Sequence, residues 1–340
     1  MPETTPEIPL KDLPNPGALE DTRTDAQRAG DYKFAEIVST VEPVVWVEKP
    51  QNTWRKFPIF NQNGSGSCVA QTLRKLYGIY LWLKTDVWVD LSASHIYQRR
   101  VNRPAGGMGG VDAFTIAQKG TTLESFAPSE KMTDAQMDNV PVNAFMEKVG
   151  EVFKLGSYIT VSPFDIDIVA SIIQKTKKGV MVWFYFANDE WIDVPTVKYP
   201  NLDRYASTTA RHSLAAVDFA LVNGKKCLII DDSWGLAYAM NGQRVITEDF
   251  FSQRCFFVAH FQNLAFEQVD VKPSYTGSVV SLQDCLKAEG LFPTNVASSG
   301  ILGPITIKGI NAFQLKYGLA IIGTGAVGPK TRAKLLELYP

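Results

Sequence analysis

The sequence predicts an α+β protein in which a helical lobe precedes a lobe built mainly from β-strands, followed by a small domain of three helices. Three observations support this fold class. Residues 68–84 form an almost wholly apolar stretch with helical spacing, as expected of a buried helix. After Ser157 the apolar pattern changes to runs that are typical of strands. Beyond residue 278, a repeated turn motif introduces short helical segments.

Length and composition indicate a folded chain of roughly two domains. The 340 residues are 45% hydrophobic and 11% aromatic, which is too apolar for a disordered protein. Lys and Arg number 34 against 35 Asp and Glu, so no net charge attracts nucleic acid or an anionic membrane. The longest unbroken apolar run, Val180 to Ala187, is far shorter than the ~20 residues that span a bilayer. We expect no nucleic acid partner, no membrane span and, from the polar, proline-rich start, no signal peptide.

The order of the domains follows from changes in composition along the chain. Residues 1–35 are expected to be an extended arm without a core, because prolines and charges occur there without apolar periodicity. The densely apolar stretch 36–270 predicts the larger domain. Its helical lobe is expected over about 45–150 and its β lobe over about 151–268.

Individual elements of the two lobes can be placed from local signals. One helix is expected to begin near Ser92, and another is expected to run from about Asp112 to Lys119. The segment from Gly179 to Phe186 predicts a buried strand. Two further strand-like runs flank Asn223-Gly224, and this dipeptide is the strongest short-range signal for a hairpin. The turn of the hairpin is therefore expected between these two residues.

The C-terminal region is a tandem repeat behind a linker. Proline, glycine and small polar residues come together at 271–278 and predict the linker. The motif Gly-x-x-Gly-Pro-x-Thr then occurs at 300–306 and again at 325–331. In each copy the proline stands at the expected first helical position, where its missing N–H is harmless. With the helical pattern around Leu282, this predicts three short helices over 279–340.

Cys68 is the candidate nucleophile. It directly follows a loop rich in glycine and serine and stands at the start of the long buried helix. At a helix N-terminus the macrodipole and the free N–H groups stabilise a thiolate, which lowers the pKa of the thiol. Gln62, six residues upstream, is the candidate donor to a developing oxyanion. The alternative is that Cys68 is a small core residue, a common role of cysteine.

A nucleophilic cysteine needs a base, and the sequence has three histidines, His95, His212 and His260. His212 opens the first strand of the predicted hairpin, and its mirror position on the second strand is 235. Asp231 and Asp232 lie within four residues of that position, and strand alternation allows only one of them to face His212. An acid so placed orients the imidazole and stabilises the imidazolium. The other two histidines are expected to be structural.

These motifs resemble, in order and spacing, the papain-type (C1) cysteine peptidases. Gln62 and Ser67-Cys68 match the oxyanion glutamine and the nucleophile of that family. His212, with Asp232-Ser-Trp-Gly235, is similar to its histidine strand and its Asn-Ser-Trp-Gly motif. The resemblance covers about residues 45–265 and implies a helical lobe and a β-barrel-like lobe, with peptidase activity that needs no cofactor and no metal. The catalytic residues that it implies are Cys68, His212, Asp232 and Gln62.

The resemblance also implies two residues that contact or shelter the substrate site. Gly107 is expected to approach the substrate backbone closely, because it lacks a Cβ atom. Trp234 is expected to cover the pair of His212 and Asp232 from water. An ordinary loop role for Gly107 and a core role for Trp234 are the alternatives. The remaining cysteines are expected to be structural thiols: Cys227, Cys255 and Cys285.

The sequence departs from the family at three points. Asp232 stands where the family usually has asparagine; a carboxylate orients His212 equally well but raises the pKa of the imidazole. Ser65 and Arg99 stand where many secreted members have disulfide cysteines, which agrees with synthesis in a reducing compartment such as the cytoplasm. The stretch before residue 45 is too short for the large inhibitory propeptide that is typical of the family.

Residues 279–339 resemble the PG-binding-1 module, which implies peptidoglycan as a partner. The likeness rests on both Gly-x-x-Gly-Pro-x-Thr motifs and departs at Ser299, where aspartate is common in the family. A small packing domain that contacts protein is the alternative. Together, the two resemblances predict a cysteine endopeptidase directed to the bacterial cell wall. An association with a phage particle or a lysis system would reconcile binding to the wall with the missing signal peptide.

The expected substrate is a peptide or protein, either a wall-associated protein or a peptidoglycan stem peptide. The alternative function is a structural or adhesive protein of the wall or virion on a peptidase fold that has lost activity. Retention of a cysteine, a histidine, an acid and a glutamine at the matching positions argues against that alternative.

Overall fold

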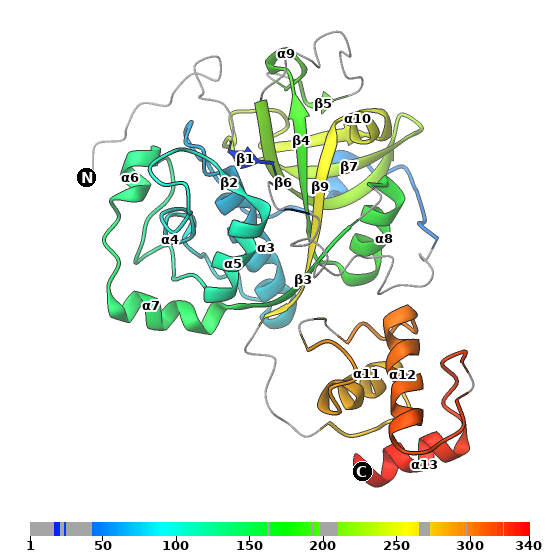
Figure 1. The fold of residues 1–340 in the computed structure, drawn as a ribbon. Helices are drawn as coiled ribbons and strands as arrows, with labels where there is room; N and C mark the ends of the chain where they lie inside the picture. The colour runs from blue at the N-terminus through cyan, green and yellow to red at the C-terminus, as the bar shows by residue number, and fades with distance from the viewer. Residues whose placement is uncertain are drawn as a thin grey trace.

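The structure is a computed structural model that describes residues 17–20, 24, 43–161, 164–191, 194–197, 210–264, 273–294, 296, 298–321 and 323–340. Of the expected arm, only residues 17–20 and 24 are described, and residues 271–272 of the expected linker lie outside the described residues. A helical half lies beside a β-sheet, and a group of three helices follows at the C-terminus (Figure 1).

The helical half is built around one long buried helix. Its α-helices are α3 (Cys68–Thr85), α4 (Ala93–Tyr97), α5 (Gly110–Lys119), α6 (Asp134–Asp138) and α7 (Ala144–Gly150), with 3-10 turns η2 (Gln51–Thr53) and η3 (Glu151–Phe153). Every residue of α3 from Cys68 to Leu81 is buried, as its apolar sequence predicts. Ser92 caps α4, since its side chain accepts the N–H of His95. The helices therefore begin close to the expected positions.

The second half is a seven-stranded sheet in the order β3-β9-β4-β6-β7-β8-β5. Its strands are β3 (Leu155–Thr160), β4 (Val180–Phe186), β5 (Thr196–Val197), β6 (Ala210–Val222), β7 (Lys225–Asp231), β8 (Gln243–Thr247) and β9 (Cys255–Leu264). The accompanying helices are α8 (Ile166–Thr176), α9 (Asn188–Trp191) and α10 (Glu248–Arg254). All paired neighbours are antiparallel except β5 and β8. A separate two-stranded parallel pair joins β1 (Ala18–Leu19) to β2 (Met108–Gly109).

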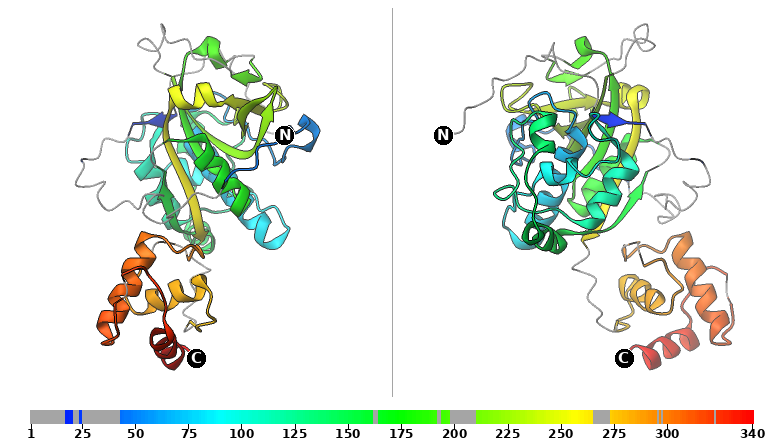
Figure 2. Two further views of the ribbon diagram at one scale, coloured as in Figure 1. Left: turned by 90° about the vertical axis from the view of Figure 1, so that its right-hand side faces the viewer. Right: turned by 60° about the vertical axis from the view of Figure 1, so that its left-hand side comes forward.

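Both faces of the sheet are covered, and β4 at its centre is buried on each side. Val182 and Phe184 belong to the hydrophobic core that includes α8 and α10. Met181 and Trp183 belong to the core that includes α3. This alternation follows the two-residue period of a strand. Figure 2 shows α3 and α8 on opposite sides of the sheet.

The hairpin predicted from Asn223-Gly224 joins β6 to β7. Both turn residues have positive φ, 52° and 74°, as this type of hairpin turn requires. A β-bulge at Val217 then shifts the register, so that Ala215 pairs with Asp231. Continuing this register, the position opposite His212 is 234, and the expected position of 235 was wrong because an unbulged hairpin was assumed.

The three expected C-terminal helices are α11 (Val279–Ala288), α12 (Pro304–Lys316) and α13 (Pro329–Leu338). The prolines of the two repeats begin α12 and α13, as predicted. The repeat extends to buried side chains: Gln283 Nε2 donates to Thr306 Oγ1 at 2.9 Å, and Gln314 Nε2 donates to Thr331 Oγ1 at 3.2 Å. Each motif threonine thus accepts a hydrogen bond from a glutamine side-chain amide of the preceding helix. Within the part of the chain that the structure describes, no helix is long and apolar enough to cross a membrane.

A buried ion pair joins α3 to the sheet. Lys75 Nζ lies 2.9 Å from Asp231 Oδ2, and the two side chains are 4% and 0% exposed. Lys75 also donates to the carbonyl oxygen of Pro58, and the Gln243 amide donates to Asp231 Oδ1 at 2.9 Å. Burial lowers the pKa of Lys75, and the charge of Asp231 opposes that shift. The pair fixes the helix to the strand that leads to Asp232.

We expect Lys75→Met to lower the free energy of unfolding by about 3–5 kcal/mol, because Asp231 would remain buried without its cation. Urea unfolding followed by circular dichroism measures the change. Lys225→Met is the matched control, since Lys225 forms an exposed pair with Asp249 at 3.1 Å and its loss is expected to cost at most about 0.5 kcal/mol. Equal losses in the two variants would contradict a structural role for the buried pair.

Candidate active site

Cys68 is the first residue of α3 and lies against the sheet. The backbone N–H of Ser213 in β6 donates to Cys68 Sγ at 3.4 Å. Ser213 Oγ bonds to Thr72 Oγ1, one turn along the helix, at 2.9 Å. These contacts place the sulfur beside His212, the neighbour of Ser213 in the strand. The first turn of a helix also offers N–H groups and a dipole that stabilise a thiolate.

His212 contacts Asp232, and Asp231 points elsewhere, as strand alternation predicts. His212 Nε2 lies 2.8 Å from Asp232 Oδ1, and both side chains are buried. The backbone N–H of Ser233 donates to the same oxygen at 2.7 Å. Because Nε2 is engaged by the carboxylate, Nδ1 is the ring nitrogen that is left for the thiol of Cys68.

The charges around His212 favour its protonated form. Burial alone would lower the pKa of His212, but the charge of Asp232 and hydrogen bonds with Asp232 and Cys68 raise it to about 9. Burial opposes ionisation of Asp232, yet the charges of His212 and Arg244 hold the pKa of its carboxyl well below its usual range. At neutral pH the site therefore holds an imidazolium beside the sulfur.

Gln62 lies in the loop that leads to Cys68 and is bridged to the residue after Asp232. Its Oε1 accepts from Ser233 Oγ at 2.6 Å, and its backbone N–H donates to Ser233 O at 2.8 Å. Its Nε2 donates to Ser65 O at 2.6 Å. The side-chain amide carries a second N–H besides the one directed to Ser65.

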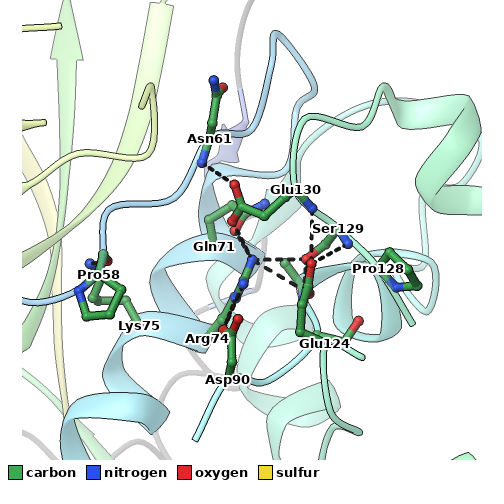
Figure 3. A network of polar contacts seen from close by, with 12 residues as sticks. Pro58, Asn61, Gln71, Arg74, Lys75, Asp90, Glu124, Pro128, Ser129 and Glu130 are labelled. Carbon is green, nitrogen blue, oxygen red and sulfur yellow. Dashed lines mark hydrogen bonds and ion pairs between the residues drawn. The ribbon is translucent and has the colours of Figure 1, made fainter. Parts of the chain in front are cut away.

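A network around Arg74 holds the start of this loop (Figure 3). Glu130 Oε2 accepts the backbone N–H of Asn61 at 2.9 Å, and Glu130 Oε1 accepts from Arg74 Nη1 at 2.8 Å. Arg74 also bonds to Asp90 Oδ1 at 2.7 Å and to Ser129 Oγ at 3.0 Å. The buried guanidinium therefore links α3 to the loop that carries Gln62.

The two residues expected at the substrate site have different neighbours: Trp234 packs on His212, and Gly107 lies near the loop before Cys68. The ring of Trp234, 8% exposed, lies 5.2 Å from the His212 ring between centroids, with an interplanar angle of 32°. Gly107 is buried, and its N–H donates to Tyr97 Oη at 3.0 Å. A Cβ on Gly66, two residues before Cys68, would meet Gly107 N at 2.6 Å. Gly107 thus packs against the loop of the nucleophile.

Two residues at Asp232 were missed from the sequence. Arg244 Nε donates to Asp232 Oδ2 at 2.6 Å, and Trp191 Nε1 donates to the same oxygen at 3.2 Å. Neither belongs to a recognisable motif. The signal that could have revealed them is Asp232 itself, because a buried carboxylate that gives one oxygen to a histidine requires donors for the other.

Residues 17–20, here named the arm segment, lie across the sulfur of Cys68. The backbone N–H of Met108 donates to Gly17 O at 2.8 Å, and β1 continues as the parallel partner of β2. A Cβ built on Gly17 would overlap Cys68 Sγ and would lie 2.8 Å from Gly66 O, so only glycine fits at this contact. The arm segment therefore covers the thiol.

Side chains of the arm segment are also anchored. Ala18 is fully buried in the core that includes α3, so the expectation of an arm without a core was wrong for this residue. Glu20 accepts a hydrogen bond from Tyr185 Oη at 2.8 Å and lies 3.3 Å from Arg211 Nη2. The apolar pair Ala18-Leu19, between Gly17 and Glu20, is too short to give an apolar periodicity, so the sequence did not reveal this burial.

The other thiols and histidines lie in surroundings that disfavour reactivity. Burial raises the pKa of Cys227 and Cys285 to about 12 and also raises that of Cys255. Burial lowers the pKa of His95 to about 4 and that of His260 to about 3, so both are neutral at pH 7. No group of three or more His, Cys, Asp or Glu side chains able to hold a metal occurs among the described residues.

Comparison with known proteins gives a family for the C-terminal helices and a fold for the remainder. Residues 276–335 match PG_binding_1, a peptidoglycan binding domain family. Xylellain, a cysteine protease from Xylella fastidiosa, superposes with a TM-score of 0.58 at 17% identity, over 74% of this chain and 97% of xylellain. No curated protein matches the chain in sequence.

A second solved structure contains the cysteine protease and lectin-like domains of Cwp84, a surface layer associated protein of Clostridium difficile. It superposes with a TM-score of 0.50 at 16% identity, over 66% of this chain and 54% of that one. The chain thus has the papain-like cysteine protease fold, followed by a peptidoglycan-binding helical domain.

Alkylation of the thiols tests the arrangement around Cys68. With iodoacetamide near pH 6, Cys68 is expected to be modified before the other three cysteines, because it lies at a helix N-terminus beside His212, whereas burial raises the pKa of the other three thiols. Gly17→Ala is expected to speed this modification, since the added Cβ overlaps Sγ and displaces the arm segment. Mass spectrometry of tryptic peptides measures both effects.

The matched control is Gly109→Ala in the paired strand, because a Cβ at Gly109 meets nothing within 4 Å. This variant is expected to label at the wild-type rate. Preferential labelling of Cys227, Cys255 or Cys285 would contradict the assignment of Cys68 as the reactive thiol. An unchanged rate in Gly17→Ala would contradict the inference that the arm segment covers this thiol.

Proposed function

We propose that the chain is a cysteine peptidase that uses Cys68 as nucleophile, His212 as acid and base, Asp232 as orienting acid and Gln62 as oxyanion donor. One observation carries the proposal: Cys68 at the start of α3 lies beside a buried histidine whose far nitrogen is 2.8 Å from a carboxylate. A papain-like fold around these residues supports it.

In the proposed mechanism, the Cys68 thiolate attacks the carbonyl carbon of a peptide bond and forms a tetrahedral intermediate. The negative oxygen can be stabilised by the Cys68 backbone N–H, which has no carbonyl partner within the helix, and by the second N–H of Gln62. His212 then donates its proton to the leaving amine, which departs and leaves a thioester. A water molecule, deprotonated by His212, attacks the thioester; the acyl group leaves as a carboxylic acid, and the Cys68 thiolate and the protonated His212 are restored.

Latency is part of this proposal. A substrate carbonyl must approach Cys68 Sγ closely, and the backbone of Gly17 occupies that position. The arm segment therefore has to leave before a peptide can bind. The contact of the arm segment with Cys68 is enough to cover the sulfur.

The C-terminal domain is proposed to hold the enzyme on bacterial peptidoglycan, as its family match supports. The substrate is then a protein of the wall or a stem peptide of peptidoglycan, met in the context of a phage particle or a lysis system. The alternative, an inactive wall or virion protein, gains some support from the covered thiol. A chain in which Gly17→Ala exposes a reactive Cys68 that still cleaves neither casein nor sacculi would favour that alternative.

Asp232→Ala is expected to lower kcat by at least about tenfold with a smaller effect on KM, because the loss falls on orientation of His212. Casein cleavage by the wild-type and Gly17→Ala chains gives the reference rates. Asp218→Ala is the matched control, since Asp218 is a buried acid of β6 paired with Lys49 and should change stability but leave kcat near its reference value. A larger loss of kcat in the control would contradict the role of Asp232.

The pH dependence follows from the pKa of His212. Because that pKa is raised to about 9, the imidazolium is present at neutral pH and is lost as the pH rises through about 9. The value of kcat/KM is therefore expected to fall above pH 9. A fall centred near pH 6.5, the ordinary value for histidine, would show that Asp232 does not act on the ring.

Binding to the wall is tested with an inactive full chain. The variant Cys68→Ala is expected to sediment with purified sacculi, and the same variant ending at residue 274 is expected to stay in solution. Circular dichroism of the shortened chain checks that the remainder is folded. Equal sedimentation of both chains would remove the C-terminal domain from the proposal and leave the peptidase assignment intact.

A further inference from the structure

The two carboxylate oxygens of Asp232 bind different partners, and only one of these partners is His212. Its Oδ1 lies 2.8 Å from His212 Nε2, and its Oδ2 accepts from Arg244 Nε at 2.6 Å. The Arg244 and Asp232 side chains are 0% and 1% exposed, so water screens neither charge. His212, Asp232 and Arg244 therefore form one buried chain of charged groups.

Arg244 is locked in place by contacts that do not involve the histidine. Its Nη1 donates to Trp191 O at 2.5 Å and to Val194 O at 2.9 Å. The guanidinium carbon lies 4.9 Å from the ring centroid of Trp191 and 5.3 Å from that of Trp234. These contacts hold the Arg244 guanidinium in place independently of Asp232, as expected for a preorganised partner.

We infer that Arg244 is a positioning residue for His212: by pairing with the outer oxygen of Asp232, it lets the carboxylate orient the imidazole without leaving an uncompensated negative charge beside it. The inference rests on the proposed function. It explains how an acid can stand where the resembled family has a neutral asparagine, because Asp232 and Arg244 together carry no net charge.

The balance of charge matters because His212 has to release its proton during each cycle. The charged or titratable groups that face it are Cys68 from α3, Asp232 after β7 and, through Asp232, Arg244 from β8. Without Arg244, the full charge of Asp232 would hold the proton on the ring more tightly. Transfer of that proton to the leaving amine would then become slower.

The test measures the titration of the His212 imidazole directly in the full-length chain. With ¹⁵N-labelled histidine, nuclear magnetic resonance follows all three imidazoles, and His95 and His260 are neutral in the range where His212 titrates. Arg244→Gln is expected to raise the titration midpoint of His212 by about one pH unit, and Asp232→Asn to lower it by at least about one unit. The double variant, Asp232→Asn with Arg244→Gln, is expected to recover kcat relative to either single variant, because it leaves neutral groups at both positions.

Two further variants separate charge compensation from structural support. Arg244→Lys retains the cation but not the three hydrogen bonds, and its midpoint is expected to stay near the wild-type value. Arg254→Gln is the matched control, because Arg254 is a fully buried arginine that pairs with Glu190 at 2.7 Å and does not contact Asp232. Its midpoint is expected to be unchanged.

The inference is overturned if Arg244→Gln folds and leaves the midpoint unmoved, or if Arg244→Lys moves it as far as Arg244→Gln does. Additive losses of kcat in the double variant would also overturn it. If Arg244→Gln does not fold, Arg244→Lys and the double variant, which buries no unpaired charge, supply the same comparison. Failure of the proposed function is recognised separately, because a chain without peptidase activity still gives the His212 titration.

Discussion

The burial of helix α3 is the constraint on which the arrangement of the site depends. Every residue from Cys68 to Leu81 is buried, yet the sequence places two cations, Arg74 and Lys75, in the middle of this stretch. Buried cations require partners, and the partners lie in the segments that carry the chemistry. Arg74 reaches the loop of Gln62 through Glu130, and Lys75 binds Asp231, the neighbour of Asp232. Packing the helix therefore also sets the positions of the groups around its first residue.

The buried polar groups fall into two chains of contacts that converge on the sulfur. One runs from Arg74 through Glu130 to the loop before α3, and the other from Arg244 through Asp232 to His212. Ser233 connects the two, because it follows Asp232 and bonds to Gln62. A change at Arg74 or at Arg244 is therefore transmitted to the same site around Cys68, so both the loop before α3 and the strand before Asp232 influence its geometry.

The elements that could be predicted from the sequence are those that a local pattern of residues specifies. The apolar run after Cys68, the Asn-Gly turn and the repeated Gly-Pro motif each specify their element through neighbouring residues, and each element lies close to its expected position. The bulge at Val217 and the ion pair of Arg244 depend on contacts between distant strands, and no local pattern records them. Gly17 is the extreme case, since a single glycine among prolines gives no sign that its backbone meets a cysteine fifty-one residues later.

The cover over Cys68 belongs to the same chain as the thiol, and this has a consequence for how it can be removed. A tethered segment acts at an effective concentration of the order of millimolar, which dilution of the protein does not change. A cut on the N-terminal side of Gly17 leaves the arm segment tethered and the thiol covered. A cut after Glu20 turns the same contacts into binding of a short free peptide, which is lost on dilution. The position of one cleavage, rather than the number of residues removed, would decide whether the cysteine is exposed.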